Sequence, residues 1–279
     1  MRAATFVAIL LLRGLASVSA AGGQPPESPG PETVVVPSGS LHLTALLWRP
    51  SGSGPFPAVL FCHGSGPTEP SRARVLGPVF ARHGYAFLYL FRRGDGLSSN
   101  QGRFLGDLLE RERSAKGEEA RKELQLRLLT TDHLDDTAAG VTFLRRAPGI
   151  DPGRVAVVGH SFGGQLALLM AERDGALRAA VAFAPAAASW DGSPELRRRL
   201  LETARRTDAP VFIAFAANDY STRPGEVLAA ERRRLAKVTE LKIYPPVGRT
   251  PEEGHAAVYR AIPRWEEDVF GFLDRHVKR

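Results

Sequence analysis

Short apolar runs alternate with longer amphipathic runs through most of this 279-residue sequence. Continuous apolar runs of this kind, bounded by turn residues, are typical of strands that are buried on both faces. In the runs between them, apolar residues recur at helical spacing, as at Leu134, Ala138 and Val141. The alternation predicts an α/β fold, in which a doubly wound, mainly parallel sheet carries helices on both faces.

The apolar runs predict eight strands within one domain over residues 32–279. The first two runs flank Pro37-Ser38-Gly39, so we expect them to pair as an antiparallel hairpin. The predicted strands cover residues 33–36, 41–48, 58–62, 86–91, 155–158, 179–184, 211–216 and 241–244.

Residues 100–130 lengthen one connection of this pattern, between the strand predicted at 86–91 and the helix predicted near Leu134. The segment is highly charged and carries several leucines. We expect a helical insertion above the sheet, which makes it a candidate lid or wall of a substrate pocket. The alternative is a solvated helical insertion with no part in binding.

Residues 1–20 have the pattern of a secretory signal peptide, with Arg2 before an apolar run at 6–12 and small residues ending at Ala20. The apolar run is too short for a membrane span, and no later apolar stretch is long enough for one. We expect cleavage near Ala20, a flexible lead-in rich in Gly, Pro and Ser over 21–31, and a secreted or periplasmic protein. The alternative is a cytoplasmic protein.

Charge and cysteine content argue against several classes of partner. Removing residues 1–20 takes away Arg2 and Arg13 and no acid, so the formal net charge falls from +7 to +5. Acids and bases interleave along 195–206 and 231–237, which favours solvated helix faces over a nucleic-acid patch. The single cysteine, Cys62, forms no intrachain disulfide and is expected to be a buried thiol. Since no metal-site spacing appears, we expect neither metal nor cofactor.

The pentapeptide Gly159-His160-Ser161-Phe162-Gly163 follows a predicted strand and opens into a predicted helix. In this context a G-x-S-x-G sequence forms a sharp turn that presents the serine hydroxyl above the sheet. Side chains at the two glycines would clash where strand and helix come close. The sequence therefore predicts an exposed Ser161 Oγ, and an ordinary Gly-rich turn is the alternative.

A serine hydroxyl needs a neighbouring base to act as a nucleophile, and that base needs a group to orient it. Asp219 follows the strand predicted at 211–216, and His255 lies on a loop before the final helix. Because ligands bind beyond the carboxyl ends of parallel strands, we expect Ser161, His255 and Asp219 to meet there. The alternatives are a turn or cap role for Asp219 and a surface position for His255. His160 is expected to point away from Ser161 and pack against a neighbouring strand.

Two backbone amides are candidates for an oxyanion hole. One belongs to Phe162, directly after the serine, and the other to the loop His63-Gly64-Ser65 at the end of an apolar strand. We expect Ser65 to supply the second amide, with Gly64 as the second choice.

Together these segments resemble the α/β-hydrolase superfamily, closest to its dienelactone-hydrolase-like and prolyl-oligopeptidase-like branches. The similarity runs from about residue 33 to the C-terminus. One departure is the nucleophile, because dienelactone hydrolases proper use cysteine where this chain has Ser161; another is that the chain lacks the propeller domain of large prolyl oligopeptidases. The resemblance rests on His63-Gly64-Ser65-Gly66, Arg93-Gly94-Asp95-Gly96-Leu97-Ser98, Asp151-Pro152-Gly153-Arg154, Gly159-His160-Ser161-Phe162-Gly163-Gly164, Asp219 and Gly254-His255.

The residues and the resemblance together predict hydrolysis of a small-molecule acyl ester, with Ser161 as nucleophile, His255 as base and Asp219 as its orienting acid. A serine peptidase or acyl-amide hydrolase could use the same three residues. A non-catalytic binding protein on the same fold is a second alternative, because a fold does not fix a function.

Overall fold

Eight strands form one sheet in the computed structural model, which describes residues 30–279. The predicted signal peptide, and the predicted lead-in except for its last two residues, lie outside the described residues. The first strand begins at Glu32. The strands are β1 (Glu32–Ser38), β2 (Leu41–Trp48), β3 (Phe56–Cys62), β4 (Ala86–Leu90), β5 (Ile150–His160), β6 (Ala179–Phe183), β7 (Val211–Ala216) and β8 (Thr239–Tyr244).

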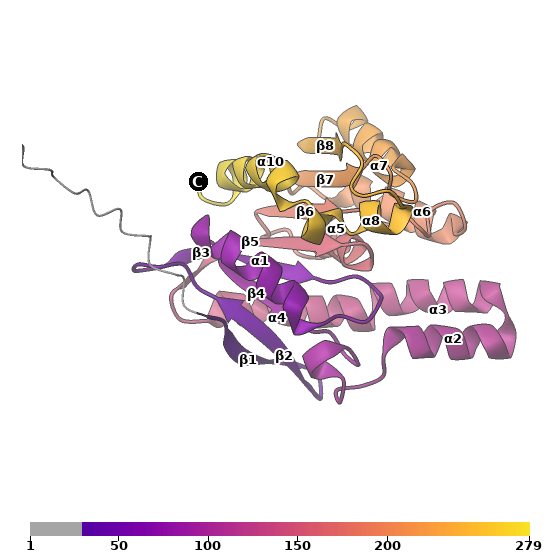
Figure 1. Ribbon diagram of the computed structural model, residues 1–279, viewed down its shortest axis with the longest axis horizontal. Coiled ribbons are helices and arrows are strands. Elements are labelled where there is room, and N and C mark those ends of the chain that lie inside the picture. The colour runs from indigo at the N-terminus through magenta and orange to yellow at the C-terminus, as the bar shows by residue number, and fades with distance from the viewer. Residues whose placement is uncertain (1–29) are drawn as a thin grey trace, which may run out of the picture.

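The strand order is β1-β2-β4-β3-β5-β6-β7-β8 (Figure 1). β1 and β2 form an antiparallel hairpin in which Val34 lies opposite Ala45, and β2 is also antiparallel to β4. All the other neighbouring strands are parallel. The predicted mainly parallel sheet and its starting hairpin are therefore confirmed, and β5, which leads into Ser161, lies in the parallel part.

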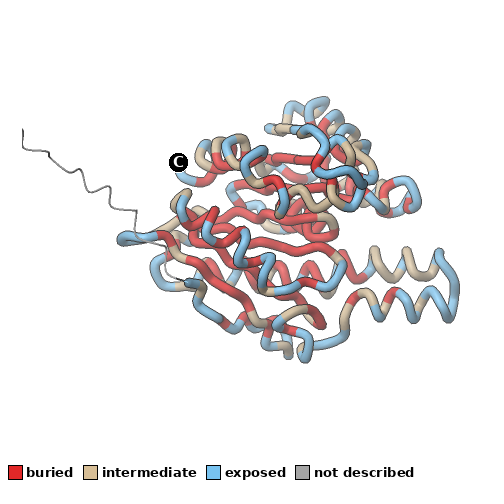
Figure 2. Tube along the Cα trace, viewed as in Figure 1, coloured by how far each residue is buried: buried red, intermediate tan, exposed pale blue. Residues whose placement is uncertain are grey.

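Helices cover both faces of the sheet, as expected for a doubly wound fold (Figure 1). Along β3, Leu60 faces one core and Phe61 the other, since successive side chains of a strand point to opposite faces. Figure 2 shows buried strands between helices whose outer faces are exposed. On the Leu60 side lie α2 (Leu105–Lys116), α3 (Glu118–Thr130), α4 (Asp132–Arg146), α5 (Phe162–Arg173), α6 (Pro194–Arg206) and α7 (Arg223–Arg234); on the Phe61 side lie α1 (Pro70–Arg82), α9 (Ala257–Arg260) and α10 (Ile262–His276).

The predicted helical insertion is a hairpin of α2 and α3 that projects from the body of the molecule (Figure 1). Its base is anchored by apolar residues such as Leu105 and Leu129, both buried, whereas its tip at Gly117 is exposed (Figure 2). A role as a lid stays a prediction. Within residues 30–279, no helix combines the length and apolarity needed to cross a bilayer.

Cys62 ends β3 and is fully buried, as the sequence predicted. Burial raises the pKa of its thiol to about 11, because the thiolate would lose its hydration. Its Sγ lies 3.8 Å from Thr137 Oγ1 on α4. Cys62 is therefore a neutral packing residue of the core and has no character of a reactive thiolate.

Candidate active site

Ser161 stands in a sharp turn between β5 and α5, as the pentapeptide predicted. Its φ is +57°, a conformation that costs a non-glycine residue about 1–3 kcal/mol. The Ser161 N–H donates to the Phe183 carbonyl at 2.8 Å, which ties the turn to the neighbouring strand β6.

The two glycines of the pentapeptide permit close approach, but to two different partners. A Cβ on Gly159 would run into the Gly163 carbonyl, where strand and helix meet. A Cβ on Gly163 would instead run into the Cys62 carbonyl at the end of β3. The predicted clash between strand and helix is confirmed for Gly159. Gly163 instead allows α5 to start close to the end of β3.

Three predicted residues meet beyond the carboxyl ends of β5 and β7. His255 Nδ1 lies 2.8 Å from Asp219 Oδ1, and His255 Nε2 lies 2.9 Å from Ser161 Oγ. Since a carboxylate only accepts, Nδ1 carries the proton and donates to Asp219. Nε2 is then an acceptor, and the Ser161 hydroxyl donates to it. The arrangement can take a proton from Ser161 onto a base that Asp219 orients.

His255 is held by a short helix, α8 (Pro251–His255), where the sequence predicted a loop. Thr250 and Glu253 form a capping box at its start, which satisfies amides that would otherwise lack partners. Asn218 fixes the approach to this helix, because its side chain donates to the carbonyls of Val247 and Thr250 and accepts from the Val247 N–H. The helix and this clamp place His255 over Ser161.

His160 contacts α8 and α9, whereas the sequence predicted packing against a neighbouring strand. Its Nε2 lies 2.8 Å from the His255 carbonyl, and its ring is 5.4 Å, edge to face, from that of Tyr259 on α9. Burial and the neighbouring His255 lower the pKa of His160 to about 3. His160 is therefore neutral, and its Nε2–H donates to the backbone carbonyl of His255, which helps to hold that histidine in place.

The loop His63-Gly64-Ser65 is fixed by Arg92, which the sequence analysis missed. The Arg92 guanidinium, which is 2% exposed, donates to the carbonyls of His63 at 2.6 Å and Gly64 at 2.7 Å. In a trans peptide the C=O and the following N–H point in opposite directions. Holding the Gly64 carbonyl therefore directs the Ser65 N–H away from Arg92. The only sequence signal for Arg92 was its place directly after the strand predicted at 86–91.

The other candidate amide, that of Phe162, is available because of its place in α5. Phe162 is the first helical residue, and the first amides of a helix have no intrahelical acceptor. The ring of Phe162 is buried under the Arg92 guanidinium, whose carbon lies 5.2 Å from the ring centre. Gly64 lies on the other side of Ser161, where a Cβ would come 3.5 Å from that of Ser161. The predicted oxyanion loop thus flanks the serine.

Acid is expected to destabilise the folded protein once the pH falls below about 6.5. Burial is the main cause that lowers the pKa values of His63, His133 and His160, so all three stay neutral in the folded state. The unfolded chain protonates them near their ordinary pKa, and unfolding then takes up protons. Each histidine contributes up to about 1.4 kcal/mol per pH unit to the loss of stability. Thermal unfolding midpoints measured from about pH 7 down to pH 5 should fall steadily.

A His133→Leu variant tests this expectation, because it removes one of the three histidines that take up a proton when the protein unfolds. The thermal unfolding midpoint of this variant should fall less steeply with decreasing pH than that of the original protein. The exposed His42 provides the control, and His42→Gln should leave the slope unchanged. Identical slopes for His133→Leu and the original protein would contradict the assignment.

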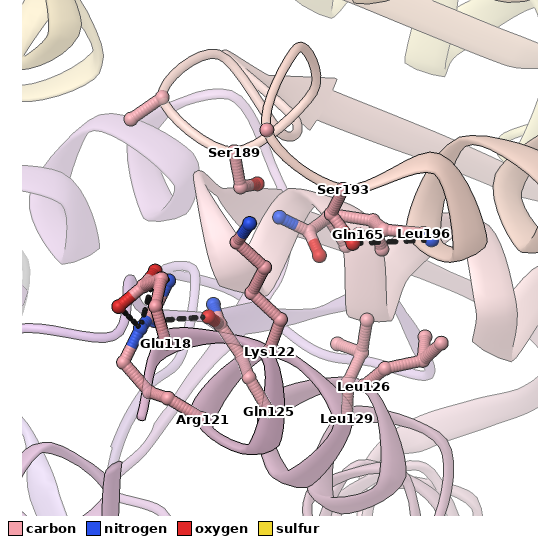
Figure 3. Close-up of a pocket in the computed structure, with 12 residues that line it drawn as sticks. Glu118, Arg121, Lys122, Gln125, Leu126, Leu129, Gln165, Ser189, Ser193 and Leu196 are labelled. Carbon is pink, nitrogen blue, oxygen red and sulfur yellow. Dashed lines mark hydrogen bonds and ion pairs between the residues drawn. The ribbon is translucent and has the colours of Figure 1, made fainter. Parts of the chain in front are cut away.

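A cavity of about 350 Å³ lies beside the first turn of α5 (Figure 3). Its residues come from α3, from α5, and from the segment that joins β6 to α6 and the start of that helix. They are Glu118, Arg121, Lys122, Gln125, Leu126, Leu129, Gln165, Ala188, Ser189, Gly192, Ser193 and Leu196. Within residues 30–279, no three His, Cys, Asp or Glu side chains gather closely enough to hold a metal ion.

The doubly wound sheet, the serine turn and its hydrogen-bonded histidine define the class of protein as an α/β-hydrolase. The chain belongs to the dienelactone hydrolase family, whose sequence profile matches residues 43–259.

Individual relatives are distant. The quorum-quenching protein AidA of Acinetobacter baumannii is 29% identical over 155 residues, which cover 56% of this chain and 44% of that protein. The acylaminoacyl peptidase of Pyrococcus horikoshii has a TM-score of 0.67 at 18% identity, covering 91% of this chain and 42% of the peptidase. A Klebsiella pneumoniae protein assigned as a dienelactone hydrolase has a TM-score of 0.64 at 21% identity, covering 89% and 98% of the two chains. This chain thus spans less than half the length of the first two relatives.

Proposed function

We propose that this protein hydrolyses carboxylic esters of small molecules through an acyl-enzyme formed on Ser161. The observation that carries the proposal is the pair of hydrogen bonds that His255 makes, 2.9 Å to Ser161 and 2.8 Å to Asp219. His255 takes the proton of Ser161 as its oxygen attacks the ester carbonyl, and Asp219 stabilises the resulting imidazolium. His255 then gives the proton to the departing alcohol, and water releases the acyl group by the same steps.

Backbone amides stabilise the negative oxygen of the tetrahedral intermediate in this proposal. Those of Phe162 and Ser65 are the pair we favour, and Gly64 is the second choice for the loop amide. Support comes from the unpartnered position of Phe162 at the start of α5 and from the orientation that Arg92 gives the Ser65 N–H. Fixed donors of this kind stabilise charge without reorganising during the reaction.

Esters are the proposed substrates because an alcohol leaves more readily than an amine from the same intermediate. The same three residues could hydrolyse an acyl amide, which is the second candidate. Comparing an aryl ester with the matched aminoacyl arylamide separates the two, since faster turnover of the arylamide would favour the amide hydrolase.

The proposal is tested by labelling the folded protein with a fluorophosphonate probe, which reacts covalently with activated serines. We expect labelling at Ser161, located by peptide mass spectrometry, together with hydrolysis of short-chain aryl esters. Ser161→Ala should abolish the labelling. Folded protein that takes up no probe and hydrolyses no ester would favour a non-catalytic binding protein.

Replacing Arg92 with methionine is expected to lower kcat about a hundredfold while KM changes little. The substitution frees the carbonyls of His63 and Gly64, so the loop amide no longer holds its place, and one oxyanion donor contributes about 10²–10³ in kcat. Steady-state kinetics with an aryl ester measure this split.

Arg93→Met is the matched control for the Arg92 variant. Arg93 pairs with the buried carboxylate of Asp136 at 2.7 Å, so its loss also costs stability but leaves the loop carbonyls bound to Arg92. A folded Arg92→Met protein with the original kcat, or an equal loss of kcat in both variants, would refute the positioning role.

We also propose export of the protein, with cleavage near Ala20. Support comes from the order of residue types in 1–20, where a basic residue is followed by an apolar run and then by small residues. N-terminal sequencing of the protein from its native host should find a mature chain that begins near residue 21. An intact Met1 would contradict export by this signal.

A further inference from the structure

The cavity beside α5 begins about one helical turn from Ser161. Gln165, which lines it, donates its backbone N–H to the Ser161 carbonyl at 3.1 Å and so belongs to the helical turn that Ser161 begins. Four residues of helix rise about 6 Å. The opposite wall belongs to the segment that follows Phe183, whose carbonyl holds the Ser161 N–H. The first turn of α5 and the segment after β6 therefore connect this cavity to Ser161.

Three leucines and one alanine form the apolar part of the cavity wall. Leu129 is 1% exposed and Leu196 is 5% exposed, and both present their side chains to the cavity. Figure 3 shows the leucines of α3 on one side, Glu118 and Arg121 on the other, and Gln165 between them. An aliphatic chain would exclude water from the leucines, which contributes favourably to binding.

Gln165 is the polar group that the fold leaves unsatisfied in this cavity. The residue is 3% exposed, yet its Oε1 is buried without any hydrogen-bond partner among the described residues. Figure 3 shows the amide nitrogen of Gln165 turned toward Lys122, which reaches up from α3, and the amide oxygen turned away from Lys122. A buried acceptor without a donor is costly, so a ligand that supplies a donor gains from meeting it.

The cations of the cavity are already paired with carboxylates of their own helix. Lys122 Nζ lies 2.6 Å from Glu119, and the Arg121 guanidinium lies 2.6 Å from Glu118. Arg121 also donates to the Gln125 side chain at 2.9 Å. An anionic ligand would have to displace these partners, whereas a neutral one would not.

We infer that this cavity is the acyl-binding site and that it selects neutral acyl chains bearing a hydroxyl or amide N–H, which donates to Gln165 Oε1. The inference rests on the proposed esterase function. The aliphatic remainder of the chain packs against Leu126, Leu129 and Leu196. Gln165 is thus a specificity residue, and its side chain takes no part in the chemical steps at Ser161.

Four p-nitrophenyl esters of matched length test the inference: hexanoate, β-hydroxyhexanoate, N-propanoylglycinate and the monoester of adipic acid. We expect kcat/KM to be about three- to tenfold higher for at least one of the two donor-bearing esters than for hexanoate, the effect of one hydrogen bond. The hydroxyl and amide esters distinguish the two sources of the donor. The adipate ester, which carries a carboxylate, should react no faster than hexanoate.

The matched variants are Gln165→Leu and Gln125→Leu. Leucine at 165 removes the unpaired acceptor at similar size, so the preference over hexanoate should fall to about one. Gln125 lines the same cavity, but its Oε1 already accepts from Arg121, and Gln125→Leu should keep the preference. An unchanged preference in folded Gln165→Leu, equal rates for hexanoate and both donor-bearing esters, or a fastest rate with adipate would each overturn the inference.

Binding to Ser161→Ala protein separates this inference from the esterase proposal, because it requires no turnover. Calorimetry should show β-hydroxyhexanoate or N-propanoylglycinate ester binding about three- to tenfold more tightly than hexanoate ester, and Ser161→Ala/Gln165→Leu should lose the difference. If no ester is hydrolysed and no probe labels Ser161, the esterase proposal fails while this comparison still decides the binding site. Equal affinities for all three esters would overturn the cavity assignment.

Discussion

Replacing Ser161 with alanine is expected to lower kcat for a short-chain aryl ester by about a million-fold. The substitution removes the oxygen that forms the acyl-enzyme, and what remains is the weak effect of binding and oxyanion stabilisation. Steady-state kinetics, with a fluorophosphonate titration of active sites, measure the loss.

The alanine variant should remain folded, because other alanines of this protein adopt a positive φ close to that of Ser161. Ala184 and Ala186 adopt φ values of 51° and 59° nearby. Thermal unfolding checks this point, and Ser114→Ala on the exposed part of α2 controls for losing a serine hydroxyl elsewhere. Turnover at the original rate in the folded variant would remove Ser161 from the mechanism.

Asp219→Asn is expected to lower kcat by about ten thousandfold with little change in fold. An asparagine has nearly the same shape, so the contact with the Tyr220 N–H, at 2.7 Å from Oδ1, can persist. What disappears is the negative charge that fixes the proton on His255 Nδ1 and stabilises the imidazolium formed when His255 takes the Ser161 proton. Steady-state kinetics with an aryl ester measure the loss of kcat, and the thermal unfolding midpoint checks that the variant is folded.

Asp208→Asn is the control for this carboxylate. Asp208 precedes β7, whereas Asp219 follows it, so the two carboxylates lie beyond opposite ends of this strand; Asp208 is exposed and pairs with Lys237 at 2.6 Å. Its replacement should leave kcat unchanged, since exposed pairs contribute little. A negligible loss in Asp219→Asn would require another residue to orient His255.

Strands, helices and the candidate triad were predictable because each left a local pattern. Buried strands are short apolar runs, and chemistry-bearing residues come directly after them, since the carboxyl ends of parallel strands share one edge. This reasoning found Ser161 and Asp219. It assigned His255 to a loop, because the five residues of α8 are too few to show helical periodicity.

Arg92, His160 and Gln165 left no such pattern. Their roles come from contacts between segments far apart in the chain: Arg92 with the carbonyls after β3, His160 with the carbonyl of His255, and Gln165 with a cavity closed by α3. Charge or polarity at such positions is equally compatible with an exposed side chain. Only packing decides whether the group is buried and what it faces.

The sequence by itself determined the doubly wound sheet, the serine turn and the chain order of Ser161, Asp219 and His255, because periodicity, glycine geometry and strand ends are local properties. The tertiary structure alone decided how the serine is surrounded: which carbonyls Arg92 binds, and which unsatisfied amide borders the cavity beside α5. Hydrogen-bond satisfaction is a property of the assembled fold, since a donor and its acceptor meet only when distant segments pack together.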